Sequence, residues 1–152
     1  MDDLAPNAAR FAALPPERRA RWAKFGAWDR SYFPSLVGLQ VEEIRTDYAR
    51  MRLPYRAELD QPAGVVHGGA IATLIDTVVV PAVGAAYPDI PVMLTLSMTV
   101  NYVGAIVQED AVAEGWVSRR GRSIVSCEAV VRAASGRTAA TASLVYQVRS
   151  PT

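Results

Sequence analysis

The sequence is poor in the residues that would tie it to disulfides, membranes or nucleic acids. Its 152 residues include one cysteine, Cys127, and one histidine, His67, and its formal net charge is +1. A single cysteine cannot form an intrachain disulfide, which favours a reducing compartment. No run reaches the roughly 18 charge-free apolar residues of a membrane span. The first residues lack the basic and apolar regions of a signal peptide. We therefore expect a cytoplasmic protein that binds neither nucleic acid nor membrane.

The composition is that of an ordinary globular chain, with 51% hydrophobic and 20% charged residues. We expect an N-terminal helical extension over residues 1–30 and one domain over residues 31–152. In the extension Pro16 and Glu17 are typical of a helix start, and basic residues then alternate with Trp22, Phe25 and Trp28. The basic residues fit a solvated face over an aromatic anchor. They also fit a basic wall beside a phosphate-bearing ligand.

Period-two patterns predict strands along most of the remaining chain. Two strands are expected within residues 37–53, and four more over residues 93–102, 111–119, 124–133 and 137–149. Leu94 and Met98 are expected on one face of the 93–102 strand, and Thr95 on the other. Short connections favour antiparallel neighbours. The predicted fold class is α+β, a curved antiparallel sheet wrapped around one central helix.

That central helix is expected over residues 68–86, the longest apolar segment of the sequence. Asp76 is the one charged residue inside it. Burying a carboxylate carries a desolvation cost, so the fold should compensate Asp76 or the protein should use it. Hydroxyls such as those of Thr73 or Thr77 could compensate it. Pro81 should kink the helix or end its regular part.

Several motifs follow one another in a recognisable order. His67-Gly68-Gly69 precedes Asp76 by nine residues, and sequences resembling family strand and turn motifs follow at residues 98–103, 108–110, 121–123 and 135–137. Together they resemble the hotdog-fold acyl-CoA thioesterases of the phenylacetate-degradation (PaaI) type, over roughly residues 33–148. The resemblance implies a homodimer, often paired into a tetramer, with active sites between subunits. It implies no metal, and no cofactor beyond the CoA of the substrate.

The resemblance implies roles for the residues around the helix start. Asp76 would act as general base or nucleophile, and the Gly68 N–H would hold the thioester oxygen, because the first N–H groups of a helix lack internal partners. His67 would orient the loop or the thioester. Nine residues place positions 67 and 76 on opposite sides of a helix and about 13 Å apart along it. We therefore expect Gly68 of one chain to meet Asp76 of its partner.

Further site residues are expected on the same resemblance. Gln61 stands where relatives often carry asparagine, and Thr95 aligns with a hydroxyl that places the attacking water. Gly69 and Thr77 are expected to contact the substrate. Phosphate contacts to CoA are expected from the basic turn, although a plain solvated hairpin fits it as well; its residues are Arg119, Arg120, Gly121, Arg122 and Ser123.

Two other functions fit the same sequence. A hotdog dehydratase or hydratase would need a histidine acting with a carboxylate, which the different sides of His67 and Asp76 disfavour. A non-catalytic acyl-CoA-binding module would keep the fold without the chemistry. The acyl group stays open between aryl-acetyl, medium-chain and branched types. Apolar residues that could line its pocket, or belong to the core, are Val78, Val79, Pro81 and Met93.

Overall fold

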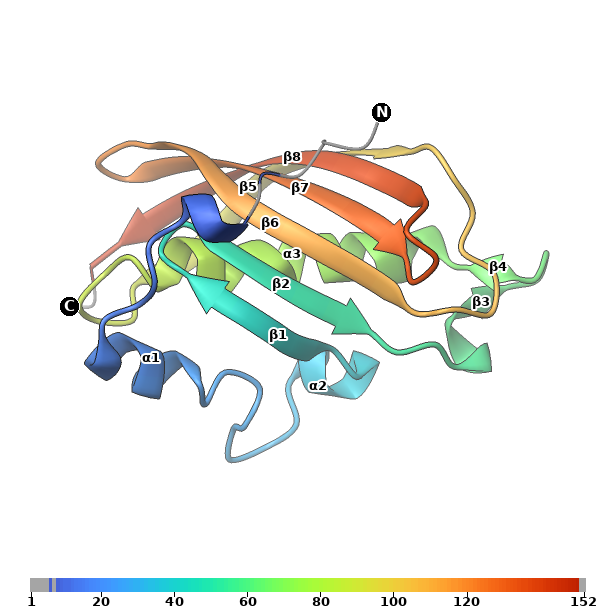
Figure 1. Ribbon diagram of the computed structural model, residues 1–152, viewed down its shortest axis with the longest axis horizontal. Coiled ribbons are helices and arrows are strands. Elements are labelled where there is room, and N and C mark those ends of the chain that lie inside the picture. The colour runs from blue at the N-terminus through green and yellow to red at the C-terminus, as the bar shows by residue number, and fades with distance from the viewer. Residues whose placement is uncertain (1–5, 7, 151–152) are drawn as a thin grey trace.

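The computed structural model describes residue 6 and residues 8–150, and in it a six-stranded antiparallel sheet curves around one long helix (Figure 1). The strands lie in the order β1 (Gln40–Arg45), β2 (Tyr48–Leu53), β6 (Ala111–Arg120), β7 (Ile124–Ala133), β8 (Thr138–Arg149), β5 (Val92–Tyr102). The helices are η1 (Ala8–Arg10), α1 (Pro16–Trp22), α2 (Phe33–Val37), η2 (Ala57–Leu59) and α3 (Gly68–Gly84). A separate hairpin pairs β3 (Asp60–Gln61) with β4 (Val65–Val66). The predicted α+β architecture is confirmed.

Helix α3 is the centre of the core. Leu74, Ile75, Val78 and Val79 have no exposed surface, and each such side chain contributes roughly 1.5–3 kcal/mol by its burial. The helix continues for one turn beyond its internal proline, Pro81, and ends at Gly84. Among the described residues, no helix is long and apolar enough to cross a membrane.

Strand β5 lies at one edge of the sheet and contains a β-bulge. Its register against β8 shifts between Thr95 and Ser97, which leaves Leu96 as the extra residue. One extra residue reverses the alternation of side chains between the two faces. Leu94 and Met98 therefore lie on opposite faces, and the prediction that they share one was wrong. The same shift places Thr95 on the side of α3, where its hydroxyl reaches the helix.

The N-terminal segment packs onto the rest of the chain around the β1 edge (Figure 1). The ring of Phe11 stacks on that of Tyr48 at 5.1 Å, and Trp22 is only 4% exposed, beside the end of α3. Of the expected N-terminal extension, residues 1–5 and 7 lie outside the described residues, and helix covers only part of the remainder.

The basic residues of α1 have a use that neither sequence interpretation anticipated. Arg18 donates from Nη1 to the carbonyl oxygens of Ala85 and Ala86, at 3.1 and 2.9 Å. Arg21 donates to the carbonyl oxygen of Pro88. Carbonyls at a helix C-terminus lack internal partners, and cations are favoured there. Arg18 and Arg21 thus bind the segment to the end of α3 and the residues that follow it.

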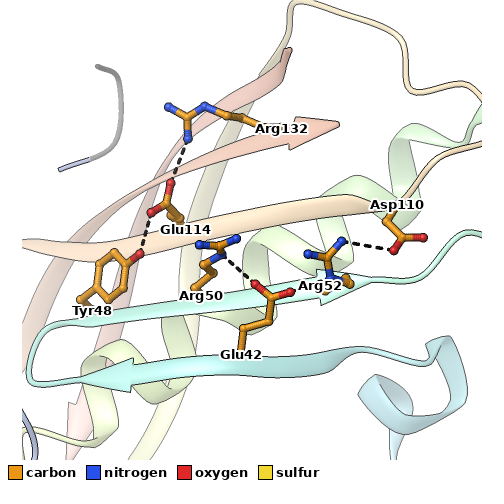
Figure 2. Close-up of polar contacts among 7 residues, drawn as sticks. All are labelled: Glu42, Tyr48, Arg50, Arg52, Asp110, Glu114 and Arg132. Atoms are coloured by element: carbon orange, nitrogen blue, oxygen red, sulfur yellow. Dashed lines mark hydrogen bonds and ion pairs between the residues drawn. The ribbon is translucent and has the colours of Figure 1, made fainter. Parts of the chain in front are cut away.

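A network of charges covers the face of the sheet opposite α3 (Figure 2). Glu114 accepts hydrogen bonds from the Tyr48 hydroxyl at 2.6 Å and from Arg132 at 2.9 Å. A second group links four side chains through three ion pairs: Glu42, Arg50, Arg52 and Asp110. Within this network three arginines face three carboxylates, so these six side chains together carry no net charge. Such partly exposed pairs contribute about 0–1 kcal/mol each.

Gly84 should stabilise the packing of the N-terminal segment against α3, because a larger residue would clash with Trp22. A Cβ placed there would lie 2.5 Å from the Trp22 ring and 3.1 Å from the end of Met93. Overpacking costs about 1–3 kcal/mol, whereas alanine gains at most about 1 kcal/mol of helix propensity over glycine. We expect Gly84→Ala to lower the free energy of unfolding measured by urea denaturation. An unchanged or higher value would show that Trp22 moves aside freely.

Candidate active site

The Asp76 carboxylate is held by two hydroxyl groups from the sheet. Thr95 of β5 donates from Oγ1 to Asp76 Oδ1 at 2.9 Å. Tyr146 of β8 donates to the same oxygen at 2.5 Å, and its hydroxyl also lies 2.8 Å from the Asp76 main-chain oxygen. Thr95 and Tyr146 are direct cross-strand partners, so both hydroxyls reach one point of α3. The acid is thus compensated and fixed in orientation.

The compensation comes from hydroxyls other than those suggested by the sequence. Thr73 donates to the Gly69 carbonyl at 2.9 Å and Thr77 donates to the Thr73 carbonyl at 2.7 Å, each one turn back along the helix. Neither hydroxyl bonds to Asp76. Tyr146 was missed as a partner, although a phenol on the inward face of a strand is a usable signal. A buried phenol needs a hydrogen-bond partner.

Burial, followed by the hydrogen bond to Asp76, raises the pKa of Tyr146 far above its ordinary value. The phenol therefore stays protonated and remains a donor. Both hydrogen bonds to the carboxylate end on Oδ1, and the described residues donate none to Oδ2. One carboxylate oxygen is anchored, and the other is left to face a water molecule or a substrate.

Asp76 lines a cleft of about 480 Å³. Helix α3 contributes Asp76, Thr77 and Val80 to it, and the N-terminal segment contributes Phe25, Trp28, Tyr32, Phe33 and Pro34. A largely apolar cleft with one carboxylate is typical of a small-molecule site. Thr77, expected to contact substrate, lies on this cleft, but its hydroxyl already donates within the helix.

The apolar residues suggested for a pocket divide between the core and a neighbouring cleft. Val78 and Val79 are fully buried in the core, whereas Met93 lines a second cleft beside the first. Val80 lines both clefts and was missed. Periodicity could not distinguish Val80 from its neighbours, because a helix that is apolar on every side has no outward face in its sequence.

The start of α3 leaves one backbone donor free. The Nδ1 atom of His67 accepts from the Gly69 N–H at 2.8 Å, so His67 caps the helix. Within residues 8–150 no hydrogen bond is donated by the Gly68 N–H. The Gly68 carbonyl accepts from the Tyr102 hydroxyl at 2.8 Å. Of the two glycines, Gly68 is therefore the one whose N–H can bind an oxyanion, and the N–H of Gly69 is already used.

Gln61 lies in the hairpin that precedes α3. Its Oε1 atom accepts from the Ala63 N–H at 3.0 Å and closes the turn. The hairpin is joined to the helix start by a bond of 2.7 Å from the His67 N–H to the Leu59 carbonyl. Gln61 therefore shapes the loop that leads to Gly68.

Within one chain, Gly68 and Asp76 lie too far apart to act on the same group. Eight residues of helix separate them by about 12 Å along the axis. They contact β5 at Tyr102 and at Thr95, on opposite sides of the bulge. One thioester carbonyl cannot reach both groups of the same chain.

The basic turn between β6 and β7 divides into one inward and several outward residues. Arg120 is half-buried, pairs with Asp47, donates to the Val83 carbonyl at 3.2 Å and lies over the Tyr87 ring at 4.9 Å. Through these contacts Arg120 holds the end of α3, and its expected phosphate contact to CoA stays a prediction. The remaining residues of the turn are exposed: Arg119, Gly121, Arg122 and Ser123.

The single thiol is not available as a nucleophile. Burial raises the pKa of Cys127 to about 12. A thiol with that pKa is almost entirely protonated near neutral pH, and the thiolate is the reactive form. Asp76 is thus the stronger candidate for chemistry in this core.

Comparison with known proteins shows the family of the chain. Residues 63–140, just over half of the chain, match the Thioesterase superfamily, and the chain belongs to that superfamily. The Halobacterium salinarum protein named "Putative esterase VNG_1336C" is 35% identical over 96 residues, which are 59% of this chain and 62% of that relative. This chain therefore spans less than two thirds of the length of that relative.

Solved structures share the fold. The E. coli PaaI protein from the phenylacetic acid degradation operon superposes with a TM-score of 0.79 at 13% identity, over 90% of this chain and 96% of that one. A hypothetical thioesterase protein from Streptococcus pneumoniae, solved with coenzyme A, superposes with a TM-score of 0.65 at 20% identity, over 74% and 87%. The hotdog fold predicted from the sequence motifs is confirmed.

The Tyr146 phenol should make stability depend on pH in a defined direction. Unfolded tyrosine ionises near its ordinary pKa of about 10, whereas folded Tyr146 stays protonated to higher pH. Its contribution is therefore complete below a pH of about 10 and is lost as the pH rises further. We expect Tyr146→Phe to be less stable by about 1 kcal/mol near neutral pH, with the gap narrowing above a pH of about 10. Urea titrations over that range would contradict this if the gap stayed constant.

Proposed function

We propose that this protein hydrolyses the thioester bond of an acyl-CoA to a free acid and CoA. The observation that carries the proposal is the Asp76 carboxylate, fixed through Oδ1 by Thr95 and Tyr146 while it lines an apolar cleft. A structural carboxylate would gain nothing from facing a cleft, whereas a general base needs an anchored orientation and access to substrate.

In the proposed reaction Asp76 takes a proton from a water molecule as the water oxygen attacks the thioester carbon. The carbonyl oxygen becomes an oxyanion, which the Gly68 N–H at the helix start binds. Collapse of the tetrahedral intermediate breaks the carbon–sulfur bond, and the proton on Asp76 passes to the leaving thiolate. In the alternative reaction the Asp76 carboxylate itself would attack the thioester carbon and expel the thiolate. The resulting anhydride would then be cleaved by water.

We propose that each active site is shared between two chains. Since Gly68 and Asp76 of one chain cannot reach one carbonyl, the oxyanion donor of one subunit would meet the base of another. The edge strand β5 offers a surface for this association, because several of its apolar side chains are about half exposed: Val92, Leu94 and Leu96. The proposed unit is a homodimer, which could pair further into a tetramer.

CoA recognition would fall to the exposed turn between β6 and β7. The Streptococcus pneumoniae neighbour that shares the fold was solved with coenzyme A, and this supports a CoA thioester as substrate. Arg119, Arg122 and Ser123 are exposed on one turn and would contact CoA phosphates. A dehydratase is disfavoured, because the Nδ1 atom of His67 already caps the helix at a distance from Asp76.

Replacing Asp76 by asparagine should separate catalysis from binding. Asp76→Asn keeps the shape of the side chain but removes the base, so we expect hydrolysis of acyl-CoA to fall about 10²–10⁴-fold. Binding of the same acyl-CoA, measured by calorimetry, should persist. The matched control is Asp89→Asn, since Asp89 is an exposed acid in the segment after α3. Equal hydrolysis by both variants and the wild type would remove the catalytic assignment of Asp76, whereas a wild type that binds acyl-CoA without hydrolysing it would be the non-catalytic binding module.

The oxyanion donor can be removed with little other change. His67 has φ −60° and ψ 135°, the conformation that favours a following proline, and proline is tolerated at the first helical position. Gly68→Pro deletes the N–H, whereas the control Gly68→Ala adds the same Cβ near Tyr102 but keeps the N–H. We expect the proline variant to lose about 10²–10³-fold in kcat and the alanine variant to lose much less.

Mixing the two inactive proteins tests the shared site. A dimer that pairs a Gly68→Pro chain with an Asp76→Asn chain retains one site with both groups intact, if each site draws on two chains. Activity should therefore return on co-expression and subunit exchange. If both groups came from the same chain, the mixed dimer would contain no intact site and would stay inactive.

A further inference from the structure

Two apolar clefts lie side by side under the N-terminal segment and share a wall. The first, of about 480 Å³, contains Asp76. The second, of about 310 Å³, extends toward Met93 and Ile90. Both clefts are lined by Phe25, Trp28 and Val80. These three residues therefore separate the cleft that holds the carboxylate from the space beyond it.

The two aromatic residues of the wall, Phe25 and Trp28, belong to a row of four aromatic rings. Ring centroids lie 5.7 Å apart between Trp22 and Phe25, 5.2 Å between Phe25 and Trp28, and 5.4 Å between Trp28 and Tyr32. Such pairs contribute about 0.5–1.5 kcal/mol each beyond their buried area. The row is fixed at one end, because Trp22 is 4% exposed and packs against Gly84. A wall anchored in this way can fix the length of the cleft that contains Asp76.

The wall also lies in the direction that an acyl chain would follow. Val80 is one turn beyond Asp76 on α3, about 6 Å along the helix, and both residues line the first cleft. An acyl group whose carbonyl lies at Asp76 would extend along this face of the helix. It would then meet the rings of Phe25 and Trp28 before it could enter the second cleft.

We propose that Phe25 and Trp28 form a stop that sets the upper length of the acyl chain. The inference rests on the proposed thioester hydrolysis and adds a specificity-determining wall supplied by the N-terminal segment. The substrate class is then a compact acyl group that ends at the wall. Removing a ring would join the two clefts and admit longer, straight chains.

The test uses saturated acyl-CoA thioethers of increasing chain length, which cannot be hydrolysed, with the full chain. For Trp28→Ala and Phe25→Ala we expect the affinity ratio of long to short chains to rise by roughly 10-fold or more, because added methylenes in an apolar pocket are worth that much. The control Trp116→Ala removes a tryptophan from a different cleft and should leave the ratio at the wild-type value. An unchanged ratio in folded Trp28→Ala and Phe25→Ala would overturn the wall.

A rescue variant distinguishes an opened wall from a merely loosened segment. Ile90 lines the second cleft only, so Trp28→Ala with Ile90→Trp refills the space beyond the wall. The gain for long chains should disappear in this double variant, and a gain that survived would contradict the proposal. If Trp28→Ala does not fold, Trp28→Leu replaces it and should give a smaller gain in the same direction.

Hydrolysis is measured separately, by thiol release from ordinary acyl-CoAs. A wild type that binds the thioethers with a length limit but releases no thiol would overturn the proposed function and leave the wall intact. If the wild type hydrolyses acyl-CoA and the variants keep its length preference, the wall is overturned and the proposed function stands.

Discussion

The structure depends on holding one partly exposed carboxylate, that of Asp76, at the boundary between an apolar core and a cleft. A carboxylate next to apolar side chains carries a desolvation cost unless hydrogen bonds compensate it. Thr95 and Tyr146 remove much of that cost by donating to the same oxygen of Asp76. They can do so because they are opposite each other on β5 and β8, and because the bulge after Thr95 sets the phase of the strand. The register of two strands, the bulge and the position of one acid on the helix are therefore a single requirement.

The helix separates two kinds of polar group that a thioester reaction would need together. Its start presents a free N–H at Gly68, and its middle presents a carboxylate about 12 Å further along. Each is prepared by neighbours of its own. His67 and Tyr102 fix the helix start, whereas the hydroxyls of the sheet fix the carboxylate. A single chain thus carries two half-sites, and this is the physical reason for expecting function to depend on association.

Much of the fold could be predicted from the sequence, because its strands alternate and its one strongly apolar helix has no competitor for the core. Asp76 could be singled out because it breaks the pattern around it. The partners of Asp76 could not be identified, since a bulge at Leu96 reverses the faces of β5 without a glycine or proline to mark it. The aromatic wall was also hidden, because it depends on contacts between residues far apart in sequence. Arg120 looked like its basic neighbours until its pairing with Asp47 was known.

The docking of the N-terminal segment has a consequence for how the protein is made. Arg18 reaches a carbonyl oxygen 67 residues later in the chain, and Trp22 packs beside Gly84. A ribosome adds about 5–20 residues per second, so the segment waits on the order of 3–13 seconds before its binding place exists. During that interval Trp22 has no place to pack. The nascent chain therefore carries an aromatic, arginine-flanked stretch whose binding place forms only after α3 has been made.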